Sequence, residues 1–307
     1  MNFTFERLSR ANIHHLVPLY FALYKKRLPV SYFEKKYNTT HLTSSLFGYF
    51  AFHNGTAAGF TGMIPYELTY DGKKELAVQS LDSMTHPLYM KRGLFKTLME
   101  KVYEDLNAEN ISFIWGFPND GSIKSATKKL NWQPTIPMNG YCIPVMNRYI
   151  SFAKRRANSM FYGENILSGI FEKELVNEFP AHSLAGCDYV TTVRNQNYFD
   201  YKVFGGSILI NMNGIKIWLK LNGSIFIGDM DNISASELKR LMPLIIDKAK
   251  KCGASNIYFQ THAGSQIDNS FATHYPRFTS WKILYHNLCS ALPLEKIGVT
   301  FGDLDSF

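Results

Sequence analysis

The chain has 307 residues, 46% of them hydrophobic and 19% charged, a composition that excludes a disordered protein and allows two domains of ordinary size. Its net charge of +8 comes from basic residues in small scattered clusters, without a helix-turn-helix, zinc-finger or RNA-recognition motif. We therefore expect no nucleic-acid partner, and interpret the positive charge as a field that attracts an anionic ligand.

Signals for export, membrane insertion and metal binding are also missing from the sequence. No window is apolar for long enough to span a bilayer, and the N-terminus lacks the pattern of a secretory signal. The cysteines lie far apart, without metal-binding spacing: Cys142, Cys187, Cys252 and Cys289. We predict reduced thiols, no metal, no membrane partner and a cytoplasmic protein. The sequence gives no signal for an oligomeric state.

The first elements in chain order are helical patterns at 13–27 and 32–37. Asn54-Gly55 and Asp71-Gly72 then divide residues 46–86 into three extended runs. These dipeptides favour the two-residue turns that join antiparallel strands. The sequence therefore predicts an antiparallel meander preceded by helices.

A strand, a polar loop, a helix and a second strand follow between 77 and 116. The extended run 77–85 leads through His86-Pro87 into a loop that ends at Gly93. Two rows of apolar residues with a spacing of four then predict an amphipathic helix: Leu94, Leu98, Val102 and Leu106, and Phe95, Met99 and Tyr103. A basic loop at a helix N-terminus is suited to binding an anion, because free backbone N–H groups and the positive helix end coincide there.

The second half repeats this order. Asn213-Gly214 and Asn222-Gly223 separate three extended runs, and a helix capped by Ser234 and a strand at 256–259 follow. We interpret the chain as a degenerate tandem duplication, with domains at 1–149 and 171–307 and a helical connection at 150–170 that breaks near Tyr162-Gly163. The alternative is two unrelated α/β units.

Residues 85–95 resemble the pyrophosphate loop of the GNAT superfamily of acyl-CoA N-acyltransferases. Gly93 takes the place of its central glycine, whereas Met90 and Phe95 depart from the usual residues. The C-terminal run 303–307 is similar to the tail of a two-lobed bacterial branch. The resemblance implies a mixed α/β, GNAT-like fold in two lobes, with acetyl-CoA as acyl donor and a small amine as acceptor, such as an amino sugar, an amino acid or a peptide.

The resemblance also implies which residues form the site. The cofactor would contact Met84, Thr85, His86, Lys91, Arg92, Gly93, Leu94, Phe95, Lys96 and Asn119, with the backbone of Met84 and His86 along the pantetheine arm. Asp82 and His86 are candidates for the base that deprotonates the amine, although a lone Asp on a strand is often structural. Thr127 stands where the family carries the tyrosine that serves as general acid. Tyr141 or Tyr89 could substitute for it, and solvent could also protonate the leaving thiolate.

The second half carries the acidic run 229–234 where the loop would be, so we expect this lobe to bind no CoA. The leading hypothesis is an acetyl-CoA-dependent N-acetyltransferase. Two alternatives stay open: a non-catalytic GNAT-like sensor or scaffold, and an aminoacyltransferase for cell-wall precursors.

Overall fold

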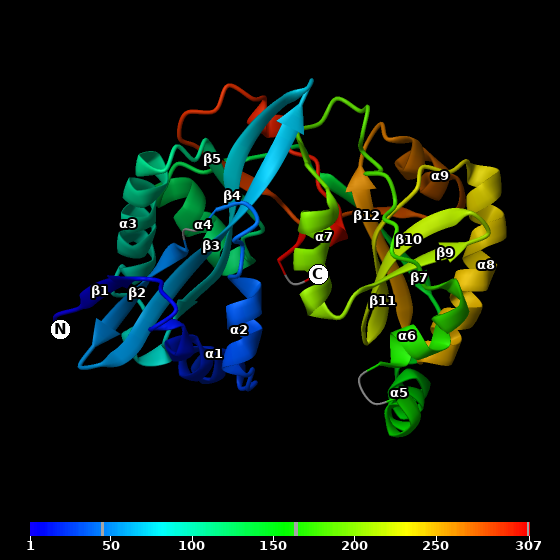
Figure 1. Ribbon diagram of the computed structural model, residues 1–307, viewed down its shortest axis with the longest axis horizontal. Helices are drawn as coiled ribbons and strands as arrows, with labels where there is room; N and C mark the ends of the chain where they lie inside the picture. Colours follow the sequence, from blue (N-terminus) through cyan, green and yellow to red (C-terminus); the bar gives the residue numbers. More distant parts are fainter. Residues whose placement is uncertain (44–45, 163–164, 306) are drawn as a thin grey trace. The chain divides into compact units, whose positions relative to one another are not determined.

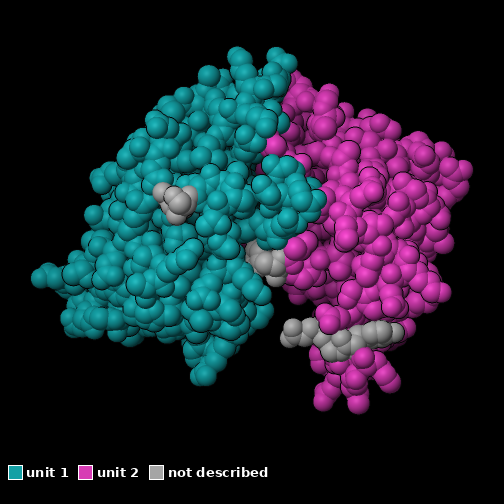
Figure 2. All heavy atoms as spheres, in the orientation of Figure 1, with its two compact units in different colours: residues 1–135, 195–201, 282–297 teal, residues 136–194, 202–281, 298–307 magenta. Residues whose placement is uncertain are grey.

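The computed structural model describes residues 1–43, 46–162, 165–305 and 307, and these residues form two compact units (Figures 1 and 2). Unit 1 consists of Met1–Thr135, Asn195–Tyr201 and Lys282–Ile297, and unit 2 of Ile136–Arg194, Lys202–Trp281 and Gly298–Phe307. Each unit has a mixed sheet flanked by helices, so the predicted mixed α/β class is confirmed. Among the described residues no helix combines the length and apolarity needed to cross a bilayer.

In unit 1 the sheet has the strand order β1-β2-β3-β4-β5-β14-β6. Its strands are β1 (Thr4–Arg7), β2 (Phe47–His53), β3 (Thr56–Tyr70), β4 (Lys73–Thr85), β5 (Phe113–Gly116), β6 (Gln133–Pro134) and β14 (Leu284–Asn287). The helices are α1 (Leu16–Tyr24), α2 (Val30–Lys36), α3 (Leu94–Ala108), α4 (Asp120–Lys129) and most of α7 (Gln196–Lys202). Both hairpin turns are confirmed, since Asn54, Gly55, Asp71 and Gly72 all have positive φ as a type I′ turn requires.

The two faces of this sheet are covered by different helices. α3 buries the predicted row Leu94, Leu98, Val102 and Leu106. One core cluster joins α3 and α4 to side chains of β2, β3, β4 and β5 such as Phe47, Met63, Val78 and Ile114. Gly62, the neighbour of Met63 on β3, faces Tyr37 at the end of α2 instead, because successive residues of a strand point to opposite faces.

Unit 2 repeats the order of elements found in unit 1, which is consistent with the predicted second lobe. Three antiparallel strands, a helix, a parallel strand, a second helix and a short strand follow one another: β9 (Ile208–Met212), β10 (Ile215–Asn222), β11 (Ser224–Met230), α8 (Ala235–Cys252), β12 (Asn256–His262), α9 (Gln266–His274) and β13 (Arg277–Thr279). The N-cap predicted at Ser234 is confirmed, and Ser234 forms a capping box with Glu237. The unit also contains β7 (Met138–Pro144), α5 (Arg148–Tyr162), α6 (Ile166–Ile170) and β8 (Thr191–Thr192). Gly163, where the helical connection was predicted to break, lies outside the described residues.

The two halves of the chain exchange one strand. β14, from the second half, pairs with β5 and β6 in unit 1. β7, from the first half, lies between β12 and β13 in unit 2. The compact units are therefore discontinuous in sequence, whereas the domains of the sequence analysis are contiguous.

Candidate functional site

The parallel strands β4 and β5 separate toward their carboxyl ends. Their pairing runs from Val78 opposite Ile114 to Ser80 opposite Gly116, the last residue of β5. β4 continues to Thr85, paired there with β3. The β5-facing edge of β4 beyond Ser80 therefore has no strand partner among the described residues, and its backbone can bind a ligand.

A β-bulge lies at this point of β4. Gly62 of β3 is opposite Leu81, but Phe60 is opposite Met84, so Asp82 and Ser83 share the place of one residue. Asp82 has a φ of 47°, a left-handed conformation that Asp tolerates better than most residues. Bulges redirect side chains and are frequent beside active sites.

The carboxylate of Asp82 is held by two groups at the end of α2. The Lys36 Nζ atom donates to Oδ1 over 2.9 Å, and the Tyr37 hydroxyl donates to Oδ2 over 3.0 Å. Only 4% of the Lys36 side chain and 11% of the Asp82 side chain are exposed. The pair therefore interacts in a setting that water screens poorly.

Asp82 lines a pocket of about 170 Å³ between the separated strands. Its other walls come from the ends of α1 and β5, from α3 and from α4, with Tyr24, Ser83, Phe95, Phe117, Asn119 and Trp132 among them. The side chain of Asn119 accepts from the Ser122 N–H over 3.0 Å and so caps α4. His86 does not line this pocket, so Asp82 is the better placed of the two candidate bases.

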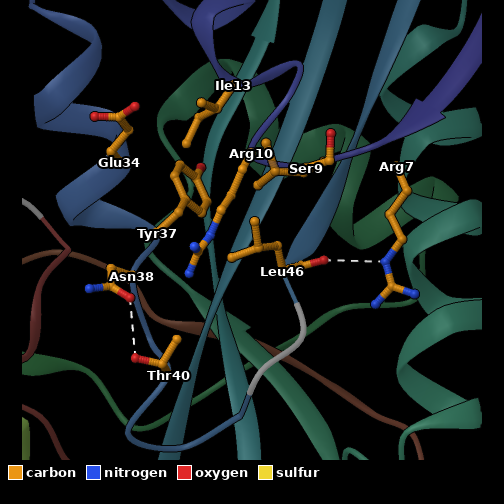
Figure 3. A pocket seen from close by; sticks show the side chains of 10 residues that line it. Arg7, Ser9, Arg10, Ile13, Glu34, Tyr37, Asn38, Thr40 and Leu46 are labelled. Atoms are coloured by element: carbon orange, nitrogen blue, oxygen red, sulfur yellow. Dashed lines mark hydrogen bonds between the residues drawn. The ribbon is translucent and has the colours of Figure 1, made fainter.

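A larger pocket of about 640 Å³ lies elsewhere in unit 1 (Figure 3). Arg7, Arg10, Glu34, Asn38 and Tyr37 are among the residues that line it. Tyr37 forms part of its wall, but Asp82 and the separated strands do not. We therefore place the chemistry of the site in the smaller pocket.

The loop before α3 has the conformation expected of an anion site. Lys91 and Gly93 have φ values of 60° and 79°. Gly93 is the N-cap of α3, and among the described residues no N-cap side chain accepts a hydrogen bond from the first N–H groups of the helix. A pocket of about 200 Å³ adjoins it, lined by Thr85, by residues 89–96 and by Ser125 and Lys129 of α4. The start of α3 and the cationic residues Lys91, Arg92, Lys96 and Lys129 therefore line one cavity, and the Lys96 ammonium also pairs with Glu100 over 3.4 Å.

The backbone N–H of His86, expected along the pantetheine arm, donates instead to the Ala58 carbonyl over 2.9 Å. Since backbone groups alternate along a strand, Met84 also directs its N–H and carbonyl toward β3. Thr85 and Ser83 then direct theirs toward the open edge. The His86 ring is likewise engaged, because Nδ1 accepts from the Leu88 N–H over 3.3 Å.

Comparisons with known proteins agree with this geometry. The family profile described as an acetyltransferase (GNAT) domain matches residues 11–134. This range contains the separated strands, the bulge and the loop before α3. Residues 11–134 form a GNAT acetyltransferase domain. For this domain the predicted superfamily and class of enzyme are thus confirmed. No curated protein sequence matches the chain.

Solved structures similar to this chain share its fold. A GCN5-related N-acetyltransferase from Kribbella flavida has a TM-score of 0.60 at 8% identity, over 94% of this chain and 71% of that protein. A GCN5-related N-acetyltransferase from Anabaena variabilis has a TM-score of 0.57 at 11% identity, over 93% of this chain and 73% of that protein. A conserved protein of unknown function from Enterococcus faecalis has a TM-score of 0.63 at 10% identity, over 94% of this chain and 73% of that protein. At these identities the likeness shows the fold alone, and it extends over both units.

The GNAT domain lacks a tyrosine at the expected position on α4. Thr127 is there, and its hydroxyl donates to the Ile123 carbonyl over 2.9 Å. Tyr141 belongs to the core of unit 2, where its hydroxyl donates to Asp268 over 2.6 Å and burial raises its pKa. Tyr89 lines the loop pocket. Tyr24 also lines the pocket beside Asp82, and the sequence analysis did not predict it. Its position at the end of α1 carries no motif that marks it as a site residue.

In unit 2 the place that corresponds to the GNAT pocket is filled by the chain itself. β11 and β12 pair at Ile225 and Phe226 and then separate, and β11 has a bulge beside Asp229. Residues 299–305 and Phe307 extend from His262 at the end of β12, which accepts from the Val299 N–H, to Gly228, where the Phe307 ring packs.

A buried charge network accompanies this tail. Arg194 forms ion pairs with Asp229 and with Asp303, the latter over 2.8 Å between Nη2 and Oδ2. Both carboxylates are fully buried. Asp229 therefore belongs to an internal ion pair with Arg194. The space between β11 and β12 is closed by the C-terminal tail, in addition to the negative charge of residues 229–234.

Proposed function

We propose that the GNAT domain transfers an acetyl group from acetyl-CoA to a small primary amine. The observation that supports this most directly is the continuous series formed by the Asp82 pocket, the open edge of β4 and the cationic cavity at the N-terminus of α3. The series suits a molecule with an anionic end, an extended arm and a reactive tip.

The residues fit such a ligand in both charge and conformation. The N–H groups at the start of α3 would bind the pyrophosphate, assisted by Lys91, Arg92 and Lys129. Gly93 adopts a φ of 79°, and the space where its Cβ would stand is open, so the loop keeps room for an anion. Phe95, which departs from the family pattern, packs against the core cluster below α3 and also lines both the Asp82 pocket and the loop pocket.

The backbone of Thr85 and Ser83 would hold the pantetheine arm by adding to the open edge of β4. Acetyl-CoA supplies the electrophilic thioester carbonyl when it is bound. Asp82 would accept the proton that the amine loses, while Lys36 and Tyr37 fix the orientation of its carboxylate. Tyr24 would contact the substrates at the mouth of the pocket. Most of the acceleration would come from orientation of the two substrates in this pocket.

Calorimetry with acetyl-CoA tests the binding part of the proposal. We expect Gly93→Glu to abolish binding, because a carboxylate would stand at the anion site. Gly72→Glu is the matched control, since Gly72 also has open space and a φ of 75° but lies at the tip of the β3–β4 turn. Absence of binding by the unmodified protein at ligand concentrations on the order of millimolar would contradict the proposal.

An amine screen, followed by release of free thiol, tests catalysis. We expect an active amine whose turnover falls about a hundredfold in Asp82→Asn, since general-base contributions have this size. The second candidate function is ligand sensing, favoured by Thr127 and by the engagement of both Asp82 oxygens with Lys36 and Tyr37. Tight binding of acetyl-CoA with no thiol release across the amine screen would favour sensing over catalysis.

A further inference from the structure

Helix α5 lies at the lower end of unit 2 in Figure 1. It packs against the unit with polar side chains facing inward. The Ser151 side chain is buried, and its hydroxyl donates to the Gly253 carbonyl over 2.7 Å. Arg155 donates to the Gly223 carbonyl over 2.7 Å, and Asn158 to the Lys251 carbonyl over 2.7 Å. Steps of four and three residues place these three side chains on one face of the helix.

The opposite face carries large apolar side chains that are exposed. We call it the α5 apolar face, and it consists of Tyr149, Ile150, Phe152, Met160 and Phe161, which are 69%, 62%, 61%, 83% and 83% exposed. Single exposed apolar residues are ordinary, but five on one side of a helix of 15 residues indicate a surface that binds something apolar.

The charge of α5 restricts the partner. The sequence Arg148–Tyr162 contains Arg148, Lys154, Arg155 and Arg156 and no acidic residue. Lys154 and Arg156 are exposed. Helical periodicity places Lys154 at the edge of the α5 apolar face and Arg156 within it. Two copies of this chain that met through the face would bring four such cations together, which disfavours self-association. An apolar and anionic partner satisfies both features.

We propose that α5 binds peripherally to the surface of an anionic phospholipid bilayer. The apolar face would enter the boundary between headgroups and acyl chains, and Lys154 and Arg156 would extend to the phosphates, as in interfacial amphipathic helices. The prediction of no membrane partner rested on the absence of a spanning segment, and a helix that lies on a membrane needs none. The polar contacts of Ser151, Arg155 and Asn158 keep the helix attached to unit 2 during binding.

Co-sedimentation of the full chain with vesicles tests this inference. We expect binding to phosphatidylcholine vesicles that contain about one third phosphatidylglycerol, weak binding to pure phosphatidylcholine, and loss of binding as salt rises from about 0.1 M to about 0.5 M. Lys154→Glu with Arg156→Glu should weaken the binding at least about tenfold. Phe152→Ser with Met160→Ser and Phe161→Ser should abolish it.

Leu244→Ser is the matched control, because Leu244 is an apolar residue of α8 that is 43% exposed and lies outside α5. It should bind vesicles like the unmodified chain. The substituted side chains are exposed, so the thermal unfolding temperature of each variant should match that of the unmodified chain. If the variant with three serine substitutions does not fold, the variant with Lys154→Glu and Arg156→Glu decides the outcome.

Three outcomes would overturn the inference. They are no binding to anionic vesicles, binding that survives both sets of substitutions, and sedimentation velocity that shows self-association through the α5 apolar face. The last outcome would assign the face to a second copy of the chain.

Discussion

The ammonium group of Lys36 lies 2.9 Å from Oδ1 of Asp82, and 4% and 11% of these side chains are exposed. Replacement of Asp82 would leave the ammonium without its carboxylate in a nearly dry setting. Asp82→Asn keeps the shape and tolerates the φ of 47°, so the loss of charge is the main change. We expect the free energy of unfolding to fall by about 3 kcal/mol.

Denaturant titration would measure this loss, and a second variant isolates its cause. Lys36→Met combined with Asp82→Asn removes both charges and should be less destabilised than Asp82→Asn alone. An equal or greater loss in the double variant would show that the buried ammonium is not the source of the cost.

Tyr37 is kept against Asp82 by a glycine on β3. A Cβ at Gly62 would stand 2.0 Å from the Tyr37 hydroxyl oxygen, so Gly62→Ala should displace the hydroxyl from Asp82. We expect a destabilisation of about 2 kcal/mol, because overpacked cores typically lose this much. In a Tyr37→Phe background the same substitution should cost less, and additive effects of the two substitutions would refute the contact.

The conformation of Gly93 predicts a graded effect on the loop. With a φ of 79° and nothing within 4 Å of its Cβ position, a side chain there meets a backbone penalty rather than a clash. We expect Gly93→Ala to cost about 1 to 2 kcal/mol, divided between stability and affinity for acetyl-CoA, and Gly93→Asn to cost less. Unfolding and calorimetric titrations would measure both quantities, and equal effects of Ala and Asn would contradict the argument.

Two buried histidines predict acid sensitivity in unit 2. Burial, and next the charge of Arg194, lowers the pKa of His182 to about 4. Burial, and next His182, lowers the pKa of His262 to about 4. Each is neutral in the folded protein, whereas the unfolded chain takes up a proton below its ordinary pKa of about 6.5. The stability they contribute is therefore present above pH about 6.5 and is lost as the pH falls toward 4.

The loss should approach about 3 kcal/mol for each histidine at pH near 4. Tryptophan fluorescence, to which the fully buried Trp218 of this unit contributes, would monitor unfolding in denaturant at several pH values. His182→Gln and His262→Gln should each flatten the dependence between pH about 6.5 and 4. A stability that did not change over this range would mean that the two rings are accessible to protons in the folded state.

Local patterns determined much of this protein. The Asn-Gly and Asp-Gly pairs specified three turns with positive φ at both residues, because few residue types occupy that region cheaply. The apolar rows from Leu94 onward specified α3, and Gly93 marked its start. These features depend on neighbours in the chain, so the order of strand, loop and helix, and with it the family, could be predicted from the residues.

Contacts between residues far apart in the chain were decided only by the tertiary structure. The Lys36–Asp82 pair joins positions 46 apart, and the exchange of β14, a strand of four residues, depends on which sheet edge is available. The closure of the second groove by residues 299–305 and Phe307, and the inward polar face of α5, also depend on contacts between distant parts of the chain. The periodicity of apolar residues shows that a helix face or a strand must pack against another element. Which element it packs against depends on the fold of the whole chain, and this choice is not encoded in any local sequence pattern.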